Sequence, residues 1–485
     1  MAESNVKKKT VSGLFWRFLE RTGAQGVNFI VSIVLARILA PELYGTVALV
    51  TVFTAILQIF VDSGLANALI QKKDADDVDF SSVFYFNMII CTVLYLGMFI
   101  AAPFIADFYD KPELVAVVRV MSLTLIISGL KNVQQAYVSR HMLFKKFFFS
   151  TLGGTITAAV VGIAMAYAGF GVWALVAQDL TNKTIDTLVL WFTVKWRPRL
   201  LFSWKRLKGL ISYGWKLLAS GLIDSVYNNI RQLIIGKLYS TSDLAFYNRG
   251  KQIPGFAITN INTSIDSVLF PVMSSQQDDA KRVRTMTRRA IKTSSYIMWP
   301  LMMGLAFTAP TVVKLMLTEK WLGCVPFLRI FCITYAFYPI HTANLNAVKA
   351  MGRSDLFLKL EIIKKVLGII VLGTTMWFGV MAMAYSLLFT SVVSQIINSW
   401  PNKKLLNYSY LEQIKDILPS IIMSLIACAC TIPFNYIGIP AIIILVIQVI
   451  IAAGVYFALS KILKIDAFNY IMDIVKSFMK KRKTA

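Results

Sequence analysis

The stretch that decides the fold of this chain occurs twice. Residues 169–178 read GFGVWALVAQ, and residues 378–387 read FGVMAMAYSL. Phe170 lies 208 residues before Phe378, and each Phe-Gly-Val opens a strongly apolar run. The same apolar segment at two such distant places indicates an internal duplication, so we expect two similar halves.

The composition places these halves in a membrane. Of the 485 residues, 57% are hydrophobic and 15% are charged, and the mean hydropathy is +0.64. Apolar runs such as 88–102 and 417–432 recur along the chain, and a helix needs roughly 20 mostly apolar residues to cross a bilayer. Transmembrane barrels are excluded because their strands alternate apolar and polar residues. We therefore predict an all-α integral membrane protein.

About fourteen transmembrane helices are expected. We place them near residues 13–39, 46–70, 82–107, 114–138, 146–168, 171–194, 212–239, 250–273, 291–317, 323–349, 356–377, 379–400, 414–434 and 439–462.

The formal net charge of +25 is concentrated in alternate loops. The basic loops include Lys72-Lys73 and the segments 195–208 and 281–292, whereas the loops between them, such as APELYG and NYIGIP, are short and nearly free of Lys and Arg. Lys and Arg favour the cytoplasmic side of a membrane. Both termini and the basic loops are thus expected in the cytoplasm, and topology explains the charge better than nucleic-acid binding does.

Further pairs repeat at a similar offset: Trp16-Arg17 with Trp215-Lys216, Asp62-Ser63 with Asp266-Ser267, and Arg119 with Arg329. Six helices per half give both halves the same orientation, and transport sites lie at such repeat interfaces. We predict six-helix lobes over 1–200 and 201–405, two additional helices over 406–464, and a basic amphipathic cytoplasmic tail over 465–485. The tail suits a helix on an anionic leaflet, with a disordered end as the alternative.

Polar residues form one stripe on each of two equivalent helices. The first holds Arg17, Arg21, Gln25, Asn28 and Ser32, and the second holds Lys216, Ser220, Asp224, Asn228 and Arg231. A charge at mid-membrane costs ~2.5–3.5 kcal/mol, so stripes facing lipid are implausible. We expect them to line a water-filled, substrate-binding cavity between the halves. The alternative for Arg17, Arg21 and Lys216 is that they reach the headgroups.

Three carboxylates are candidates for ion or proton coupling: Asp62, Asp224 and Asp266. A structural hydrogen bond is the alternative for Asp62 and Asp266, and a local ion pair is the alternative for Asp224. The five cysteines and two histidines show no ligand spacing, so no metal or cofactor is expected.

Several motifs together resemble one family. They are RILAPELYG, DSGLANALIQ, ASGLIDSVYNNIRQLIIGK, LAFYNRGKQIP, LFPVMSSQQDD and EKWLGCVPFLRI, and in this order they look like the polysaccharide exporter (Wzx-type flippase) family of the multidrug/oligosaccharidyl-lipid/polysaccharide superfamily. The resemblance implies two six-helix lobes, a central cationic cavity and alternating access. It also implies transport of a lipid-linked glycan from the cytoplasmic to the outer leaflet of a bacterial plasma membrane, for export of lipopolysaccharide O-antigen, capsule or exopolysaccharide.

A polyprenyl-diphosphate glycan also suits the residues. Arg donates paired hydrogen bonds to a diphosphate, Asn, Gln and Ser suit sugar hydroxyls, and the tail can remain among the membrane lipids. A glycan polymerase is a candidate protein partner, and we expect the chain to act as a monomer.

Two other function classes agree less well with these residues. A cation-coupled multidrug exporter of the same architecture should carry acidic residues in its cavity, whereas Arg and Lys dominate these stripes. A membrane enzyme acting on glycans needs an acid/base constellation, and we find no paired carboxylates beside a histidine. The chain is therefore expected not to be an enzyme.

Overall fold

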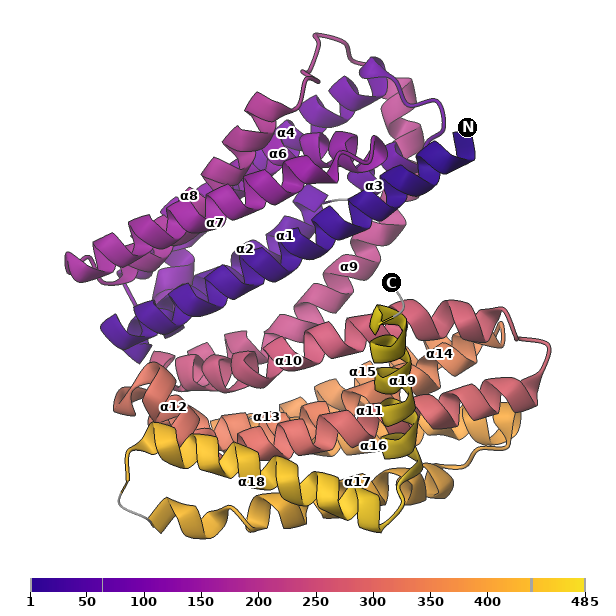
Figure 1. Cartoon of the computed structure of the whole chain (residues 1–485). Helices are drawn as coiled ribbons and strands as arrows, with labels where there is room; N and C mark the ends of the chain where they lie inside the picture. Colours follow the sequence, from indigo (N-terminus) through magenta and orange to yellow (C-terminus); the bar gives the residue numbers. More distant parts are fainter. Residues whose placement is uncertain (1, 63, 437–438, 484–485) are drawn as a thin grey trace. The chain divides into compact units, whose positions relative to one another are not determined.

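The computed structural model describes residues 2–62, 64–436 and 439–483, and every regular element in these ranges is a helix (Figure 1). The chain order is α1 (Ala2–Ile38), α2 (Pro41–Asp62), α3 (Leu65–Gln71), α4 (Asp77–Phe108), α5 (Leu114–Met121), α6 (Leu123–Arg140), α7 (Phe144–Tyr167), α8 (Val172–Thr193), α9 (Trp204–Leu238), α10 (Thr241–Ser274), α11 (Ala280–Phe307), α12 (Ala309–Leu317), η1 (Glu319–Cys324), α13 (Val325–Ala336), α14 (Tyr338–Ala350), α15 (Ser354–Thr375), α16 (Val380–Leu406), α17 (Tyr410–Ala429), η2 (Ile432–Tyr436), α18 (Ala441–Ile462) and α19 (Asp466–Lys483).

The predicted all-α membrane fold is confirmed. Within the described ranges, 8 helical segments are long and apolar enough to span a membrane, and a bent pair raises the number to 9. Each of the fourteen expected segments is helical, but the number of spans stays a prediction. The segment expected as one helix over 291–317 bends by 68° between α11 and α12. Pro310, in the first turn of α12, lacks the N–H that would continue the α11 ladder.

The chain forms two compact units, residues 1–245 and 246–485. The division between them lies inside α10, so α9 belongs to the first unit. The lobes predicted from the repeat end near residue 200, and this sequence-based division stays a prediction.

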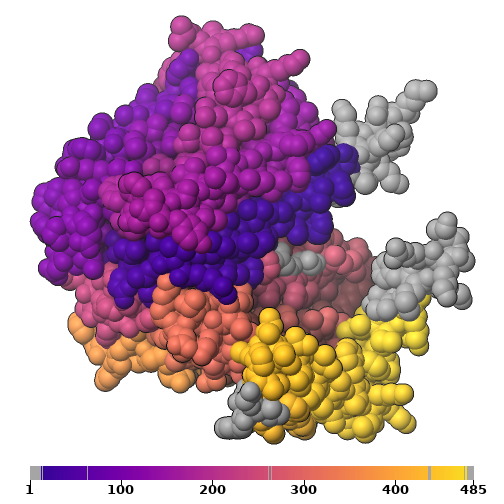
Figure 2. Space-filling view, turned by 60° about the vertical axis from the view of Figure 1, so that its left-hand side comes forward, coloured from indigo at the N-terminus to yellow at the C-terminus, as the bar shows by residue number. Residues whose placement is uncertain are grey.

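In the first unit, α1 packs along α7, and α7 packs along α8; Figure 2 shows the indigo surface of α1 directly against the magenta surface of these helices. Small residues of α7 allow the close approach. A Cβ on Gly154 would lie 2.8 Å from the carbonyl oxygen of Asn182, and one on Gly162 would lie 3.0 Å from the Cβ of Gln178. The face of α8 that carries Gln178 and Asn182 is therefore held against α7.

Helix α9 packs along α2 with glycines at the contact. A Cβ on Gly236 would lie 2.0 Å from the Cδ2 of Leu49, and one on Gly64 would lie 2.8 Å from the carbonyl oxygen of Gly214. Lys237 of α9 also pairs with Asp110, 3.1 Å between Nζ and Oδ2. These contacts explain why α9, the first helix of the predicted second repeat, belongs to the first unit.

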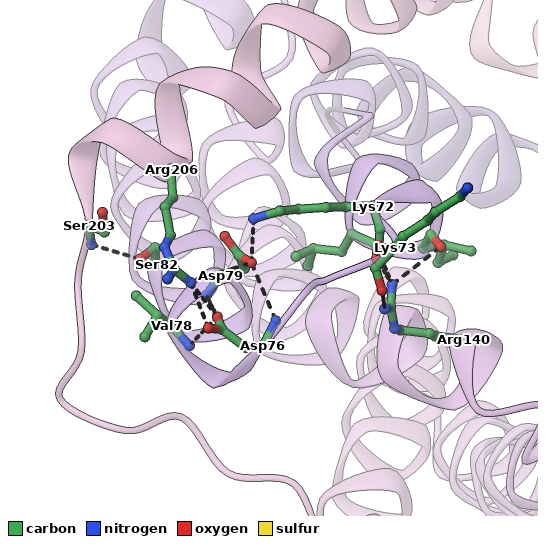
Figure 3. A network of polar contacts seen from close by, with 11 residues as sticks. Lys72, Lys73, Asp76, Val78, Asp79, Ser82, Arg140, Ser203 and Arg206 are labelled. Atoms are coloured by element: carbon green, nitrogen blue, oxygen red, sulfur yellow. Dashed lines mark hydrogen bonds and ion pairs between the residues drawn. The ribbon is translucent and has the colours of Figure 1, made fainter.

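Opposite Lys237, at what we call the basic end of the unit, polar contacts join α3, α4, α6 and α9 (Figure 3). Arg140 ends α6 and donates to the carbonyl oxygens of Leu69 (2.8 Å) and Lys73 (2.7 Å), as well as to that of Lys72. The Leu69 carbonyl lies in the last turn of α3, and those of Lys72 and Lys73 follow the helix directly, so the helix offers them no partner. One guanidinium therefore caps the end of α3.

The start of α4 holds the start of α9 at the same end. Asp76 caps α4 and accepts two bonds from Arg206, 2.7 and 2.6 Å from Nη1 to its carboxylate oxygens. The guanidinium lowers the pKa of Asp76 below its ordinary value. The buried Asp79 pairs with Lys72, 2.5 Å between Oδ2 and Nζ. The backbone N–H of Ser203, just before α9, donates to the Oγ of Ser82 at 2.9 Å.

The second unit joins α11 to α17 by charged contacts. Arg288 donates to both carboxylate oxygens of Asp416 at 2.7 and 2.8 Å, and the hydroxyl of Tyr408 donates to Asp416 at 2.8 Å. Arg284 pairs with Glu412 at 3.0 Å. Further inside, buried amides bridge α14 and α17, since Asn344 and Gln413 exchange hydrogen bonds of 2.8 and 3.0 Å.

The predicted amphipathic tail is helical over α19. Phe468 and Ile471 pack against a cluster that includes the buried Tyr296 and Tyr456, and Asp466 pairs with Lys292 at 3.1 Å. The apolar face of the tail thus contacts the unit's own core. Val475 and the basic residues at 480–483 have side chains outside the described ones, so membrane contact by the tail stays a prediction.

Candidate functional site

The α1 stripe begins with an arginine that turns toward α7. The guanidinium of Arg17 pairs with Glu20 at 2.9 Å and lies over the rings of Phe147 (4.4 Å to the centroid) and Phe144 (5.2 Å). Arg21 is exposed, and Gln25 is half-buried. Ser32 donates to the carbonyl of Phe29, one turn earlier, at 2.9 Å.

The α9 stripe lies away from the packed face of its helix. Lys216, Ser220, Asp224 and Asn228 are all exposed, and Arg231 is half-buried. Gly221, on the α2 side of α9, has Ile59 at 3.1 Å from where a Cβ would stand. Whether the two stripes face one cavity stays a prediction.

An open cavity of about 530 Å³, lined by both polar and apolar side chains, lies among α1, α2, α5 and α8 of the first unit. Asn28 brings the α1 stripe to its wall, and three further amides line it: Gln58, Gln178 and Asn182. All four positions are near the middle of their expected membrane spans. The cavity therefore puts hydrogen-bonding groups where lipid would offer none.

An acid and a base of α8 share this wall. Asp179 and Lys183 are one turn apart, 3.8 Å between Oδ2 and Nζ, and their side chains are 41% and 33% exposed. Both also line the cavity. At this depth neither group reaches the headgroups easily, so the open space beside them is best filled by water or a polar ligand.

Asp62 lies next to the cavity at the end of α2. Its carboxylate accepts from Gln58 at 3.2 Å and from Asn132 of α6 at 3.4 Å. Asn132 also donates to the carbonyl of Val61 at 3.2 Å. The helix breaks here, and Gly64 has φ +67°. Asn132 thus satisfies a carbonyl that the break releases.

A second ion pair lies behind the cavity wall. Lys131 of α6 and the buried Asp186 of α8 are 2.5 Å apart between Nζ and Oδ2. Lys131 and Lys183 both act electrostatically on Asp62. The first unit therefore holds a connected set of charged groups along α2, α6 and α8.

In the second unit, Asp266 of α10 accepts from Asn346 of α14 at 2.8 Å. Among the described residues, no three Asp, Glu, His or Cys side chains are close enough to hold a metal ion. The coupling roles assigned to Asp62, Asp224 and Asp266 stay predictions.

The sequence reasoning missed four charged residues of the first unit: Lys131, Asp179, Lys183 and Asp186. The signal was present, because the expected helix over 171–194 carries the polar run QDLTNKTID near its middle. The membrane cost of charge, applied to this helix, indicates Asp179, Lys183 and Asp186, whereas Lys131 lies on the helix expected over 114–138.

The comparisons with known proteins agree with this fold. A family model described as polysaccharide biosynthesis protein matches residues 34–326, which is more than half of the chain. The chain therefore belongs to the family of polysaccharide biosynthesis membrane proteins.

Relatives cover most of the chain. The lipopolysaccharide biosynthesis protein WzxC of Escherichia coli is 24% identical over 425 residues, covering 86% of this chain and 83% of that protein. The teichuronic acid biosynthesis protein TuaB of Bacillus subtilis is 26% identical over 355 residues, covering 72% of each chain.

Solved structures share the fold. The lipid II flippase MurJ, in an inward closed conformation, matches with a TM-score of 0.75 at 13% identity, covering 93% of this chain and 98% of that one. A multidrug resistance transporter of the MATE family, in an inward-facing conformation, matches with a TM-score of 0.61 at 16% identity, covering 79% and 94%. The chain thus has the fold of the superfamily predicted from its motifs.

Proposed function

We propose that this chain is a flippase that moves a lipid-linked oligosaccharide from the cytoplasmic to the outer leaflet of the plasma membrane for export of a surface polysaccharide. The observation that carries the proposal is the cavity among α1, α2, α5 and α8, whose wall holds four amides, an aspartate and a lysine. Amides and charges at mid-membrane are expensive unless a polar ligand or water uses them. Family membership supports the same substrate class.

The diphosphate of the lipid carrier is assigned to Arg21 and Arg231. Arg21 is exposed on α1. Arg231 follows Lys216 by fifteen residues on α9, a rise of about 22 Å along the helix, so it lies far from the cytoplasmic headgroups that Lys216 can reach. Arginine suits a diphosphate because its planar fork donates two parallel hydrogen bonds. Lys216 and Arg17 would draw the headgroup in from the basic end.

Release on the outer side requires a state with weaker contacts. A ligand shifts the equilibrium between two states only by its different affinity for them. Asp224 lies two helical turns before Arg231 on α9, so its carboxylate can compete with the diphosphate when alternating access changes the surroundings of this helix. The vesicle assay described next can also compare coupling ions and glycans.

Reconstituted vesicles test the proposal. Proteoliposomes are loaded with a fluorescent polyprenyl-diphosphate disaccharide, and its movement between leaflets is followed by access to an impermeant quencher. We expect movement without covalent change. A new glycan product would indicate an enzyme, and efflux of cationic drugs without lipid movement would indicate a multidrug exporter.

A variant pair sharpens the assay. Arg231→Ala should abolish movement at equal protein level, and Arg231→Lys should recover part of it because an ammonium keeps the charge and loses the fork. Arg353→Ala is the matched control, since Arg353 lies on an exposed turn and pairs with Asp355 at 2.8 Å. Wild-type transport by Arg231→Ala would remove this residue from the mechanism.

A further inference from the structure

We infer that the cavity among α1, α2 and α8 is a sugar-binding subsite that takes a neutral, hydroxyl-bearing sugar of the lipid-linked glycan. This inference rests on the proposed function and adds to it the residues that recognise the glycan rather than the lipid headgroup.

The four amides on the wall match the chemistry of a sugar. Each amide side chain can donate and accept, as a hydroxyl group does. Gln58 uses its Nε2 on Asp62 at 3.2 Å, and Asn182 uses its Nδ2 on the hydroxyl of Thr155 at 3.3 Å. In the part of the chain that the structure describes, the oxygens of both amides accept no hydrogen bond. These oxygens can therefore accept from sugar hydroxyls.

The charged pair on the wall favours a neutral sugar. Asp179 and Lys183 are 3.8 Å apart, which is too long for a hydrogen bond and close enough for each to offset the other's charge. Neighbouring sugar hydroxyls can bridge such a pair by donating to the carboxylate and accepting from the ammonium. An acidic sugar would meet the Asp179 carboxylate, and like charges repel.

The wall is held in place by helix packing. Gln178 lies against Gly162 of α7, since a Cβ on this glycine would be only 3.0 Å from the Cβ of Gln178. Asn182 is held by its hydrogen bond to Thr155. Val47 and Leu175 add apolar surface. Fixed polar groups beside apolar ones are typical of small-molecule sites, and an apolar patch suits the C–H face of a sugar ring.

The cavity continues the basic stripe of α1. Asn28 lies seven residues after Arg21 on α1, a rise of about 10 Å along the helix. A diphosphate held at Arg21 therefore leaves the attached sugar directed along α1 toward Asn28. The lipid headgroup and its first sugar would then use neighbouring parts of one stripe.

The test compares two probes on purified protein in detergent. One is a short-chain polyprenyl diphosphate, and the other is the same lipid carrying one N-acetylglucosamine. We expect wild-type protein to prefer the sugar-bearing probe, and D179N/K183Q to lower that preference about tenfold, because two hydrogen bonds to charged groups become weaker bonds to neutral amides. An unchanged preference in this variant would overturn the subsite.

Two controls separate the possible failures. K111Q/E113Q removes another pair that is also 3.8 Å apart but lies outside the cavity, and it should leave the preference as in wild type; an equal loss would overturn the inference. Where D179N/K183Q does not fold, A55F fills the cavity from α2 and should give the same loss.

Three further results bear on the subsite or on the parent proposal. Tighter binding of a probe that carries glucuronic acid would overturn the neutral class. Wild-type protein that binds the bare lipid and the sugar-bearing lipid equally overturns the subsite and leaves the flippase proposal standing. Protein that binds neither probe and moves neither in vesicles overturns both.

Discussion

Asp62 in the first unit and Asp266 in the second make similar hydrogen bonds, but the helices that carry them end at different points. Each belongs to a repeated Asp-Ser pair, and each accepts from an asparagine on a neighbouring helix, Asn132 at 3.4 Å and Asn346 at 2.8 Å. However, α2 ends at Asp62, whereas α10 continues past Asp266 to Ser274. The repeat therefore keeps the side-chain hydrogen bond while the backbone changes.

One residue accounts for the difference. Gly64 follows the first Asp-Ser pair with φ +67°, and Val268 follows the second. A β-branched residue avoids positive φ, so Val268 keeps α10 helical. A Cβ on Gly64 would also lie 2.8 Å from the carbonyl oxygen of Gly214. Glycine is needed both for the conformation and for the close approach of α9.

An ion pair between two helices occurs in each unit, and the helix that supplies the acid in one unit corresponds to the helix that supplies the base in the other. In the first unit α4 supplies Asp79 and α9 supplies Arg206, 3.8 Å apart. In the second unit α11 supplies Arg288 and α17 supplies Asp416, 2.7 Å apart. Arg288 lies 209 residues after Asp79, and Asp416 lies 210 residues after Arg206. The start of α17 thus meets α11 much as the start of α9 meets α4.

In both pairs the acidic side chain is the buried one, whichever helix carries it. The side chains of Asp79 and Asp416 are 0% and 5% exposed, whereas those of Arg206 and Arg288 are 43% and 46% exposed. A long side chain can reach a buried partner while its head stays near water. Although the acidic and basic residues exchange helices between the units, the aspartate is buried and the arginine is partly exposed in both.

The largest effect should come from Gly64→Val, which gives the first unit the residue of the second. Positive φ and the contact with Gly214 together should cost about 4 kcal/mol. Chemical denaturation in mixed micelles, followed by tryptophan fluorescence, measures this loss.

The reverse change is the control. Val268→Gly should cost only about 1 kcal/mol, the usual cost of glycine inside a helix. A Gly64→Val protein as stable as wild type would show that the break in α2 does not depend on glycine.

The next effect is the loss of a buried carboxylate. Asp416→Ala leaves Arg288, Lys292 and the hydroxyl of Tyr408 without their common acceptor and should cost ~3 kcal/mol. Asp79→Ala should cost less, about 2 kcal/mol, because Arg206 keeps Asp76 as its closer partner. The same denaturation measurement ranks the two, and the reverse order would contradict this account.

Exchanging the signs of an exposed pair should have a smaller effect. Asp76→Arg and Arg206→Asp should each destabilise the protein slightly, and the double variant should recover part of the loss, since the attraction does not depend on which partner is positive. Recovery stays incomplete because Asp76 also caps α4. A double-mutant cycle measures the coupling, and a coupling of zero would mean that the pair adds nothing.

The smallest effect concerns pH. Arg206 lowers the pKa of Asp76 below its ordinary value, so the pair stabilises the protein above the ordinary aspartate pKa of about 3.9. This contribution is lost as the pH falls through the lowered pKa. The stability difference between wild type and Asp76→Asn should thus be present at neutral pH and decrease progressively as the pH falls below about 4. A difference that grows on acidification would contradict the assignment.

The fold was largely predictable because helix spans follow from apolar runs. The order of the helices, the basic loops and the repeat all came from the sequence. The breaks did not, since Gly64 and Pro310 lie within apolar stretches whose hydropathy continues across them. A broken helix depends on a few backbone angles and on a neighbour such as Asn132, and hydropathy reports neither.

The site was predictable in part. Asn28 was expected to line a cavity between the halves, which stays a prediction; the cavity that it lines inside the first unit also takes Gln178, Asn182 and Lys183 from α8. Helical spacing shows which residues share a face of one helix, but it does not show which helices meet. Arg17 was assigned to a cavity from the same spacing; its guanidinium lies over Phe144 and Phe147, and its place in a cavity stays a prediction.

The packing of α9 along α2 has a consequence for biosynthesis. Gly45, Gly64 and Leu49 of the α2 region meet residues that the ribosome adds well over a hundred positions later, namely Thr241, Gly214 and Gly236. A nascent chain that has inserted six helices therefore still lacks the partner of this face. The first unit can be completed only when the opening helix of the second repeat has entered the membrane, so the two repeats cannot be assembled as independent halves.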